Sequence, residues 1–251
     1  MTQLCRNNLK PLLDSHRNPH AGLLLARGMI NWPVDGEAGG GAKRSLIDKA
    51  VGLNPSSLYL AALKRWQKAT SQEGRFAQLQ IDLVSRLYIG VTRENALESG
   101  VTTSHAYGMP MIPGSAVKGL CRATAKRMKL GDQAMQFMFG ADTDSESEAE
   151  AGGLIFHDAW WVGKGNEKPF VREIVTPHHQ EYYVRQGENP ATDFDSPIPA
   201  NQIAVTGAFY FVIEGDRAWT GMTKRLLQMA LSDTGIGGKR SSGYGFFAQN
   251  A

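Results

Sequence analysis

The chain has 251 residues, of which 42% are hydrophobic and 20% are charged. This is the composition of an ordinary globular protein, which excludes wholesale disorder, and no apolar run is long enough for a transmembrane helix. The formal net charge is +3, but an acidic loop at 141–152 carries five acidic residues and no base. The rest of the chain is therefore more basic than the total, which favours a polyanionic partner.

The two cysteines and the first residues indicate a cellular compartment. Cys5 and Cys121 lie far apart and give neither a disulfide framework nor the spacing of metal ligands. The first residues lack the charged-then-apolar layout of a signal peptide. We therefore expect a cytoplasmic protein in a reducing compartment, with no membrane association, no metal and no other cofactor.

Residues 1–75 are predicted to form a helical extension that packs on a main domain at 76–251. A helix at Ser57–Thr70 is expected to bury one face. That face contains Leu60, Leu63 and Trp66. Before this helix, Asn31–Ala42 contains a proline and three consecutive glycines. This composition indicates a flexible connection.

The main domain is predicted to follow the order β-α-β-β-α-β, with an insertion at 163–201. The strands are expected at Phe76–Leu87, Gly153–Trp161, Gln202–Glu214 and Gly245–Gln249, and the helices at Ala116–Lys129 and Arg217–Leu231. Ser115 is the expected cap of the first helix, after a break at Pro113. This order is that of the ferredoxin-like (RRM-type) α+β fold.

The glycine-rich segment Gly235–Gly245 is the strongest candidate for a binding site. Its five glycines permit unusual backbone angles, and successive N–H groups in such a turn can form a concave anion site. Two cations and two serines add donors, and a tyrosine could stack on a base. The segment fits neither a P-loop nor a dinucleotide fingerprint. The predicted RNA contacts are Gly237, Gly238, Lys239, Arg240, Ser241, Ser242 and Tyr244. The alternative is a flexible connection with incidental charge.

Two segments together resemble the RAMP superfamily of CRISPR-associated proteins. Met111–Arg122, with the sequence MIPGSAVKGLCR, is similar to the IPGSS-x-KG-x-x-R motif that opens the first helix of these proteins. The glycine-rich segment stands in its expected place between the second helix and the last strand. A third segment, Val175–Pro199, contains VTPHH, YY and DSP and is similar to the sixth-subunit family of type III-B (Cmr) effector complexes.

The resemblance implies a non-catalytic RNA-binding structural subunit of a ribonucleoprotein in antiviral defence. Such a subunit holds the 3′ part of the guide RNA and caps the backbone of RAMP subunits. The implied partners are guide RNA, with target RNA as a further candidate, the backbone RAMP subunit and the small helical subunit. Further candidate RNA contacts are Arg93, His105, Ser115, Lys118 and Arg122. For Ser115 the positive end of the helix is a physical reason. Lys118 and Arg122 are four residues apart on one helix face and could follow consecutive phosphates. The alternative is a capped helix with solvent-facing bases.

Two other functions stay open. In target-cutting relatives a loop aspartate precedes the motif helix, but Thr92–His105 contains none. A RAMP endoribonuclease acting on guide precursor or target RNA could instead use His178, His179 and Tyr182 in metal-free cleavage. Adjacent histidines in a strand point to opposite faces, so they make a poor joint metal site, and an RNA or partner contact is the favoured interpretation. The last alternative is an end cap that contacts only proteins.

Overall fold

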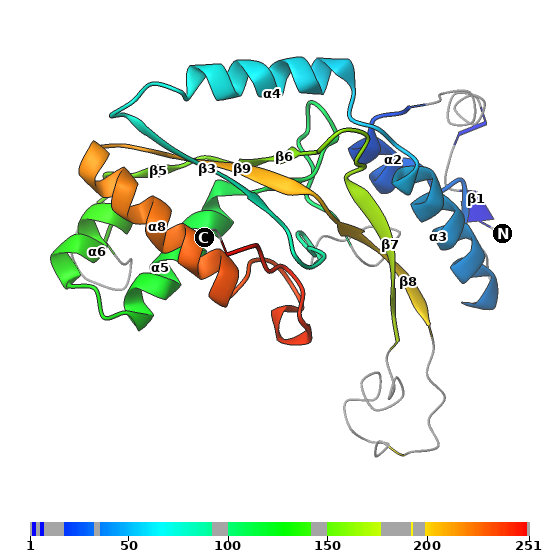
Figure 1. The fold of residues 1–251 in the computed structure, drawn as a ribbon. Coiled ribbons are helices and arrows are strands. Elements are labelled where there is room, and N and C mark those ends of the chain that lie inside the picture. The colour runs from blue at the N-terminus through cyan, green and yellow to red at the C-terminus, as the bar shows by residue number, and fades with distance from the viewer. Residues whose placement is uncertain are drawn as a thin grey trace.

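The structure is a computed structural model that describes residues 2–3, 6–7, 18–32, 36–91, 100–141, 150–176, 192 and 199–249. Its centre is an antiparallel sheet with the strand order β3-β9-β6-β4, in which β5 also pairs with β9 (Figure 1). The strands are β3 (Phe76–Asp82), β4 (Met111–Ile112), β5 (Ile155–Phe156), β6 (Ala159–Val162) and β9 (Ala208–Glu214).

Three helices lie on one side of this sheet, namely α5 (Gly114–Arg127), α6 (Asp132–Phe139) and α8 (Arg217–Asp233) (Figure 1). Their apolar faces and the sheet form one core. The core includes Val117, Leu120, Leu227, Leu231, Leu79, Ile81, Phe209, Phe211 and Phe247. Because burying one large apolar side chain contributes about 1.5–3 kcal/mol, this layer dominates the stability of the fold.

The succession of elements in this layer confirms the predicted α+β class. The order β3, α5, β5–β6, β9, α8 is compatible with the ferredoxin-like arrangement. The closing strand expected at Gly245–Gln249 is much shorter than predicted. It is reduced to one antiparallel bridge between Leu83 and Phe247.

Helix α4 (Ser57–Ala69) lies on the opposite side of the sheet (Figure 1). It begins after Ser56, whose Oγ accepts a hydrogen bond from the Tyr59 N–H at 3.2 Å. The buried face of α4 contains Tyr59, Ala62 and Leu63. Leu60, which was predicted to lie on that face, is 43% exposed. The prediction of a helix here was correct, but its buried face is rotated.

The N-terminal region also holds β1 (Thr2–Gln3), α2 (Ala21–Arg27), β2 (Asn31–Trp32) and α3 (Gly36–Val51). The prediction of a flexible connection at Asn31–Ala42 is wrong, because β2 and the start of α3 lie in this segment. A glycine in a helix costs about 1 kcal/mol relative to alanine, but the later turns of α3 bury three apolar side chains, which outweighs that cost. These are Leu46, Ile47 and Ala50.

The predicted strand Gln202–Glu214 is in fact two strands in different sheets. Strand β8 (Ala200–Val205) pairs with β7 (Phe170–Val175) in a separate two-stranded sheet, and β9 belongs to the central sheet. The break falls at Gly207, whose φ is +103° and where a Cβ would lie 2.6 Å from Trp161 Nε1. Helix α3 packs against β7 and β8, and Asp48 accepts a hydrogen bond from Arg172 at 2.6 Å.

Parts of two predicted segments lie outside the described residues. They are 142–149 of the acidic loop, and 177–191 and 193–198 of the insertion predicted at 163–201. The described part of that insertion contains β7 and the first residues of β8. The division of the chain at residue 75 stays a prediction.

Candidate nucleic-acid interface

The glycine-rich segment is held against the chain that follows β3. The N–H of Gly238 donates to the Tyr88 carbonyl oxygen at 2.8 Å, and the N–H of Gly245 donates to the Arg86 carbonyl oxygen at 2.8 Å. A Cβ on Gly237, whose φ is +92°, would lie 2.2 Å from the Tyr88 carbonyl oxygen. Only glycine permits this approach. The N–H of Gly238, predicted to bind phosphate, is therefore used inside the protein.

The tip of the segment projects from this anchor as a short turn. Lys239 has a left-handed backbone with φ 56°, and the 3-10 helix η1 (Arg240–Ser242) follows it. The N–H of Ser242 donates to Lys239 and that of Gly243 to Arg240, both at 3.0 Å. Within the described part of the chain, no group accepts from the N–H groups of Arg240 and Ser241. The residues from Arg240 to Gly243 are exposed, so these two donors and their flanking cations face the surroundings.

Two tyrosines form the floor beside this tip. The rings of Tyr88 and Tyr244 have centroids 4.8 Å apart at 59°, and the Lys239 Nζ lies 5.4 Å from the Tyr88 centroid. Arg86 forms an ion pair with Glu173 nearby. Burial, with a smaller contribution from the Glu173 charge, raises the pKa of Tyr244 above its ordinary value. Tyr244 is neutral at pH 7 and half-buried, with part of its surface left at the tip.

The start of helix α5 differs from the prediction. The residue that caps the helix is Pro113, and Ser115 lies exposed in the first turn without a role as the cap. The Gly114 N–H donates instead to Asp158 Oδ1 at 2.7 Å, and a Cβ on Gly114 would lie 2.0 Å from the Phe156 carbonyl oxygen. Because the Asp158 carboxylate already occupies the positive helix end, a phosphate there would meet an internal anion.

The other motif residues lie further along α5. Lys118 and Arg122 are half-buried on this helix, four residues apart and so on one face. At its C-terminal end, Arg127 donates to Thr234 Oγ1 at 3.0 Å. This contact joins α5 to the residue that precedes the glycine-rich segment. Lys118 lies roughly 14 Å from Arg127 along the helix axis, so a surface shared by Lys118 and the tip stays a prediction.

The remaining predicted contacts are less well placed. His105 is exposed in a turn, and its carbonyl oxygen lies 3.1 Å from His20 Nε2. Arg93, His178, His179 and Tyr182 lie outside the described residues. Their contacts with RNA or with a partner stay predictions.

Helix α4 covers the aromatic face of the central sheet. The sequence did not predict this arrangement. Trp160 stacks on Tyr59 at a centroid distance of 5.7 Å and an angle of 16°, and on Trp66 at 6.4 Å and 21°. The Tyr210 hydroxyl, on the strand beside Trp160, lies 2.8 Å from Thr70 Oγ1. Many RNA-recognition domains stack bases on exposed aromatics of this face. Here the protein's own helix occupies that position.

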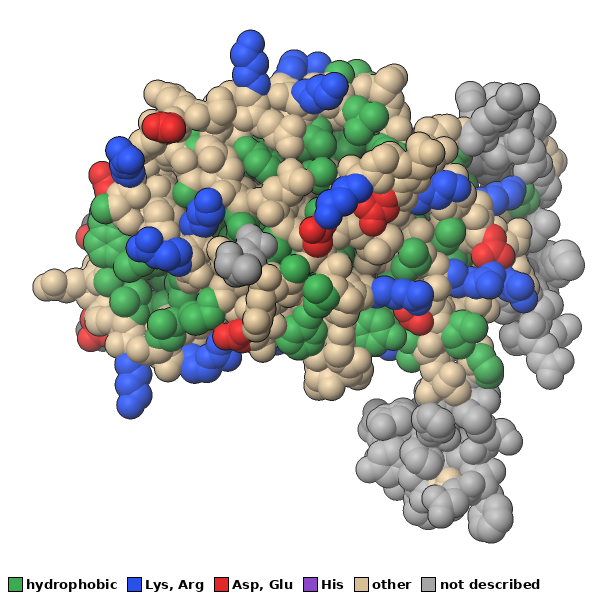
Figure 2. All heavy atoms as spheres, in the orientation of Figure 1, with side chains coloured by type: hydrophobic (Ala, Val, Ile, Leu, Met, Phe, Trp, Pro, Cys, Tyr) green, Lys and Arg blue, Asp and Glu red, His purple; other side chains and the backbone are tan. Residues whose placement is uncertain are grey.

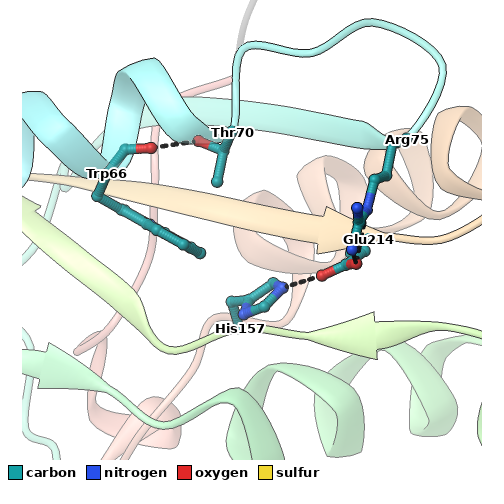
Figure 3. Close-up of polar contacts among 5 residues, drawn as sticks. All are labelled: Trp66, Thr70, Arg75, His157 and Glu214. Atoms are coloured by element: carbon teal, nitrogen blue, oxygen red, sulfur yellow. Dashed lines mark hydrogen bonds and ion pairs between the residues drawn. The ribbon is translucent and has the colours of Figure 1, made fainter.

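A polar network also closes one end of the sheet (Figure 3). Glu214 Oε2 lies 2.8 Å from His157 Nε2, and Oε1 accepts from Arg75 Nε at 2.8 Å. The Trp66 ring meets the His157 ring edge-on at a centroid distance of 5.1 Å. Hydrogen bonds from Arg75 and then His157 hold the pKa of Glu214 below its ordinary value. Both carboxylate oxygens accept hydrogen bonds or ion pairs, so this network joins the residue before β3, strand β9 and the β5–β6 connection.

Neither a metal centre nor a membrane span is found in the part of the chain that the structure describes. No group of three or more His, Cys, Asp and Glu residues there could hold a metal ion. Among the same residues, no helix combines the length and the apolar character needed to cross a bilayer.

The model of the RAMP superfamily matches residues 80–248, which is more than half of the chain. The chain belongs to the RAMP superfamily. This RAMP protein is 27% identical to the CRISPR system Cmr subunit Cmr6 of Pyrococcus furiosus, over 64% of each chain. It is also 27% identical to the CMR subunit Cmr6 of Saccharolobus solfataricus, over 67% of this chain and 56% of that relative. The matches span less than two thirds of either relative.

A solved structure shows the same fold. The RAMP protein superposes on a chain of the cryo-EM structure of type III-B Cmr-beta bound to cognate target RNA with a TM-score of 0.63 and 22% identity. The superposition covers 83% of this chain and 71% of that chain. At this identity the likeness concerns the fold alone.

Proposed function

We propose that this RAMP protein is a non-catalytic, RNA-binding structural subunit of a type III-B CRISPR (Cmr) ribonucleoprotein in antiviral defence. In this role it holds the 3′ part of the guide RNA and caps the backbone of RAMP subunits in the cytoplasm. The names of its relatives and its fold likeness to a chain of Cmr-beta support this proposal. The proposed partners are guide RNA, target RNA and other Cmr subunits.

The observation that carries the RNA-binding part is the exposed tip at residues 239–243. A left-handed residue followed by a right-handed turn directs successive N–H groups toward one point, which is a geometry that binds anions. Here the N–H groups of Arg240 and Ser241 are available, and Lys239 and Arg240 bring two positive charges to the same turn. A phosphate of the RNA backbone matches this combination of donors and charge.

The covered sheet face supports contact with the backbone in preference to the bases. With Trp160 and Tyr210 beneath α4, the usual stacking platform is closed. Tyr244 is the aromatic side chain beside the tip, and it is half-buried against Tyr88. We therefore expect RNA affinity that depends steeply on salt and little on sequence.

The non-catalytic part rests on the loop before the motif helix and on the polar network of Figure 3. The sequence Thr92–His105 contains no aspartate. The His157 ring is hydrogen-bonded to the Glu214 carboxylate, which also accepts a hydrogen bond from Arg75. This arrangement stabilises the fold and offers no unengaged acid–base pair.

The RNA-binding part is tested by measuring the affinity of the purified chain for single-stranded RNA at several salt concentrations. Lys239→Ala with Arg240→Ala should weaken binding and flatten the plot of log K against log salt by about 0.7 for each phosphate that the variant no longer neutralises. Lys64→Ala with Lys68→Ala on α4 is the matched control, because it removes the same charge from exposed positions. Equal effects of the two double variants would reject the tip as the site.

The non-catalytic part needs its own experiment. The purified chain is incubated with guide-repeat RNA and with target RNA, with and without magnesium, and we expect both RNAs to stay intact. Cleavage that disappears in His178→Ala or His179→Ala would establish an endoribonuclease instead. If the isolated chain binds no RNA and only the assembled complex does, the protein is an end cap that contacts proteins.

A further inference from the structure

An apolar groove lies between the C-terminal end of α5 and the middle of α8, and none of its lining residues belongs to the glycine-rich tip. Its volume is about 370 Å³. Its apolar walls are formed by Met128, Leu130, Met222, Leu226 and Met229. Met128 is 59% exposed. Figure 2 shows hydrophobic side chains gathered over the region of α5, α6 and α8, with Lys and Arg side chains beside them. Exposed apolar patches of this kind mark interaction sites.

The groove continues along α8 into a second hollow of about 430 Å³. Arg225 and Met229 line both hollows, and Ser232 lies at the far end of the second. From Met222 to Ser232 the groove follows α8 for about 15 Å, which is close to three turns of a helix. Gln228, Ser232 and Gln249 make the second hollow more polar than the first, so the apolar part of the groove runs from Met222 to Met229. That part follows α8 for about 10 Å, or two turns, which suits the apolar stripe of a second helix with anchors at i, i+3 or i+4, and i+7.

The charges around the groove decide what kind of helix fits. Lys129 and Arg225 are among the residues that line the first hollow, and none of the described residues that line either hollow is acidic. Lys129 has a left-handed backbone with φ 57°. That conformation costs a residue with a side chain about 1–2 kcal/mol, and it places the cation in the turn at the groove. Acidic residues beside the apolar stripe would complement this rim.

We propose that this groove binds an amphipathic helix of another protein, with a Leu- or Met-rich stripe flanked by Glu or Asp. The methionines support this occupant, because their unbranched, polarizable side chains adapt to an inserted apolar surface. RNA fits less well, since the walls are apolar and a polyanion would leave them unsatisfied. The proposal is independent of the RNA-binding function, because it rests on a different surface.

The test uses the full-length chain and a labelled synthetic helix of about four turns as the probe. The probe carries Leu at i, i+3, i+4 and i+7 and Glu on both flanks, and a second probe carries Lys at each Glu position. Fluorescence anisotropy gives the Kd of each. We expect the Glu probe to bind saturably and about tenfold more tightly than the Lys probe, as two complementary rim charges suggest.

Two variants locate the binding site. Met128→Glu should weaken the Glu probe about tenfold, because it places a charge in the apolar wall. Leu58→Glu is the matched control, since Leu58 is 62% exposed on α4 and far from the groove in the fold. Arg225→Glu should reverse the preference, weakening the Glu probe and strengthening the Lys probe. Because Met128 and Arg225 are exposed, both variants should fold, and circular dichroism checks this.

Four outcomes of the probe experiments would overturn the proposal. They are the absence of saturable binding of the Glu probe, equal binding of both probes, equal effects of Met128→Glu and Leu58→Glu, and displacement of the probe by single-stranded RNA. The last outcome would make the groove a polyanion site. A dimer of the free chain that Met128→Glu dissociates would assign the groove to a second copy, and it would also overturn the proposal.

Discussion

Gly237→Ala should destabilise the protein through the anchor of the glycine-rich segment. The new Cβ would lie 2.2 Å from the Tyr88 carbonyl oxygen, well below the 3.0 Å that real Cβ contacts respect. The left-handed φ of +92° costs about 1–2 kcal/mol for a residue with a Cβ. Displacing the segment also weakens the hydrogen bond from Gly238 to Tyr88, which contributes about 1 kcal/mol. The expected loss of stability is therefore about 2–4 kcal/mol.

Gly243→Ala is the matched control for this change. Gly243 has a similar φ of +86°, but a Cβ there meets nothing within 4 Å. It should cost only the backbone strain, about 1–2 kcal/mol. Urea unfolding followed by tryptophan fluorescence measures both values. If the two variants lose the same stability, the contact between Gly237 and Tyr88 does not hold the segment in place, and the reasoning fails.

Two further predictions concern polar contacts of the sheet. Asp158→Ala should lower the unfolding free energy by about 1 kcal/mol in thermal unfolding, because the Gly114 N–H at the start of α5 loses its acceptor; a stability equal to wild type would contradict this. Glu214→Gln should lower stability at pH 7 and flatten its decline in acid. Arg75 and His157 depress the pKa of Glu214, so its contribution is present above the ordinary value of 4.5 and is lost as pH falls through the folded pKa. An unchanged acid profile would contradict that assignment.

The sequence predicts the elements whose signal is local. The alternation at Phe76–Leu87 and the helical spacing at Arg217–Leu231 correspond to β3 and α8. The predictions that the structure corrects concern elements that depend on contacts between distant parts of the chain. The burial of Leu46 and Ile47 carries α3 through three glycines that favour a loop. One apolar run at Gln202–Glu214 is divided because Gly207 must pass close to the Trp161 ring.

The position of the candidate site stays a prediction, and the structure changes part of its expected mechanism. Its glycines were assigned to a ligand, whereas Gly237 and Gly238 pack against Tyr88 and leave the tip to provide donors. Ser115 was expected to cap its helix, but the Gly114 N–H donates to Asp158 in the β5–β6 connection, and no local pattern indicates such a contact. The sequence does not predict the apolar groove, because Met128 and Met222 come together only through the packing of α5 on α8.

Under the proposed function, the position of α4 affects which guide RNAs the protein can hold. A defence system must accept every spacer that its genome stores, so each protein that grips the guide has to be indifferent to nucleobase identity. In this domain α4 covers the sheet face on which bases could stack, and hydrogen bonds of Tyr59 and Thr70 hold the helix there. Little surface is left on which one spacer could be favoured over another. Indifference of this kind would be built into the fold, and it would need no adjustment when new spacers are acquired.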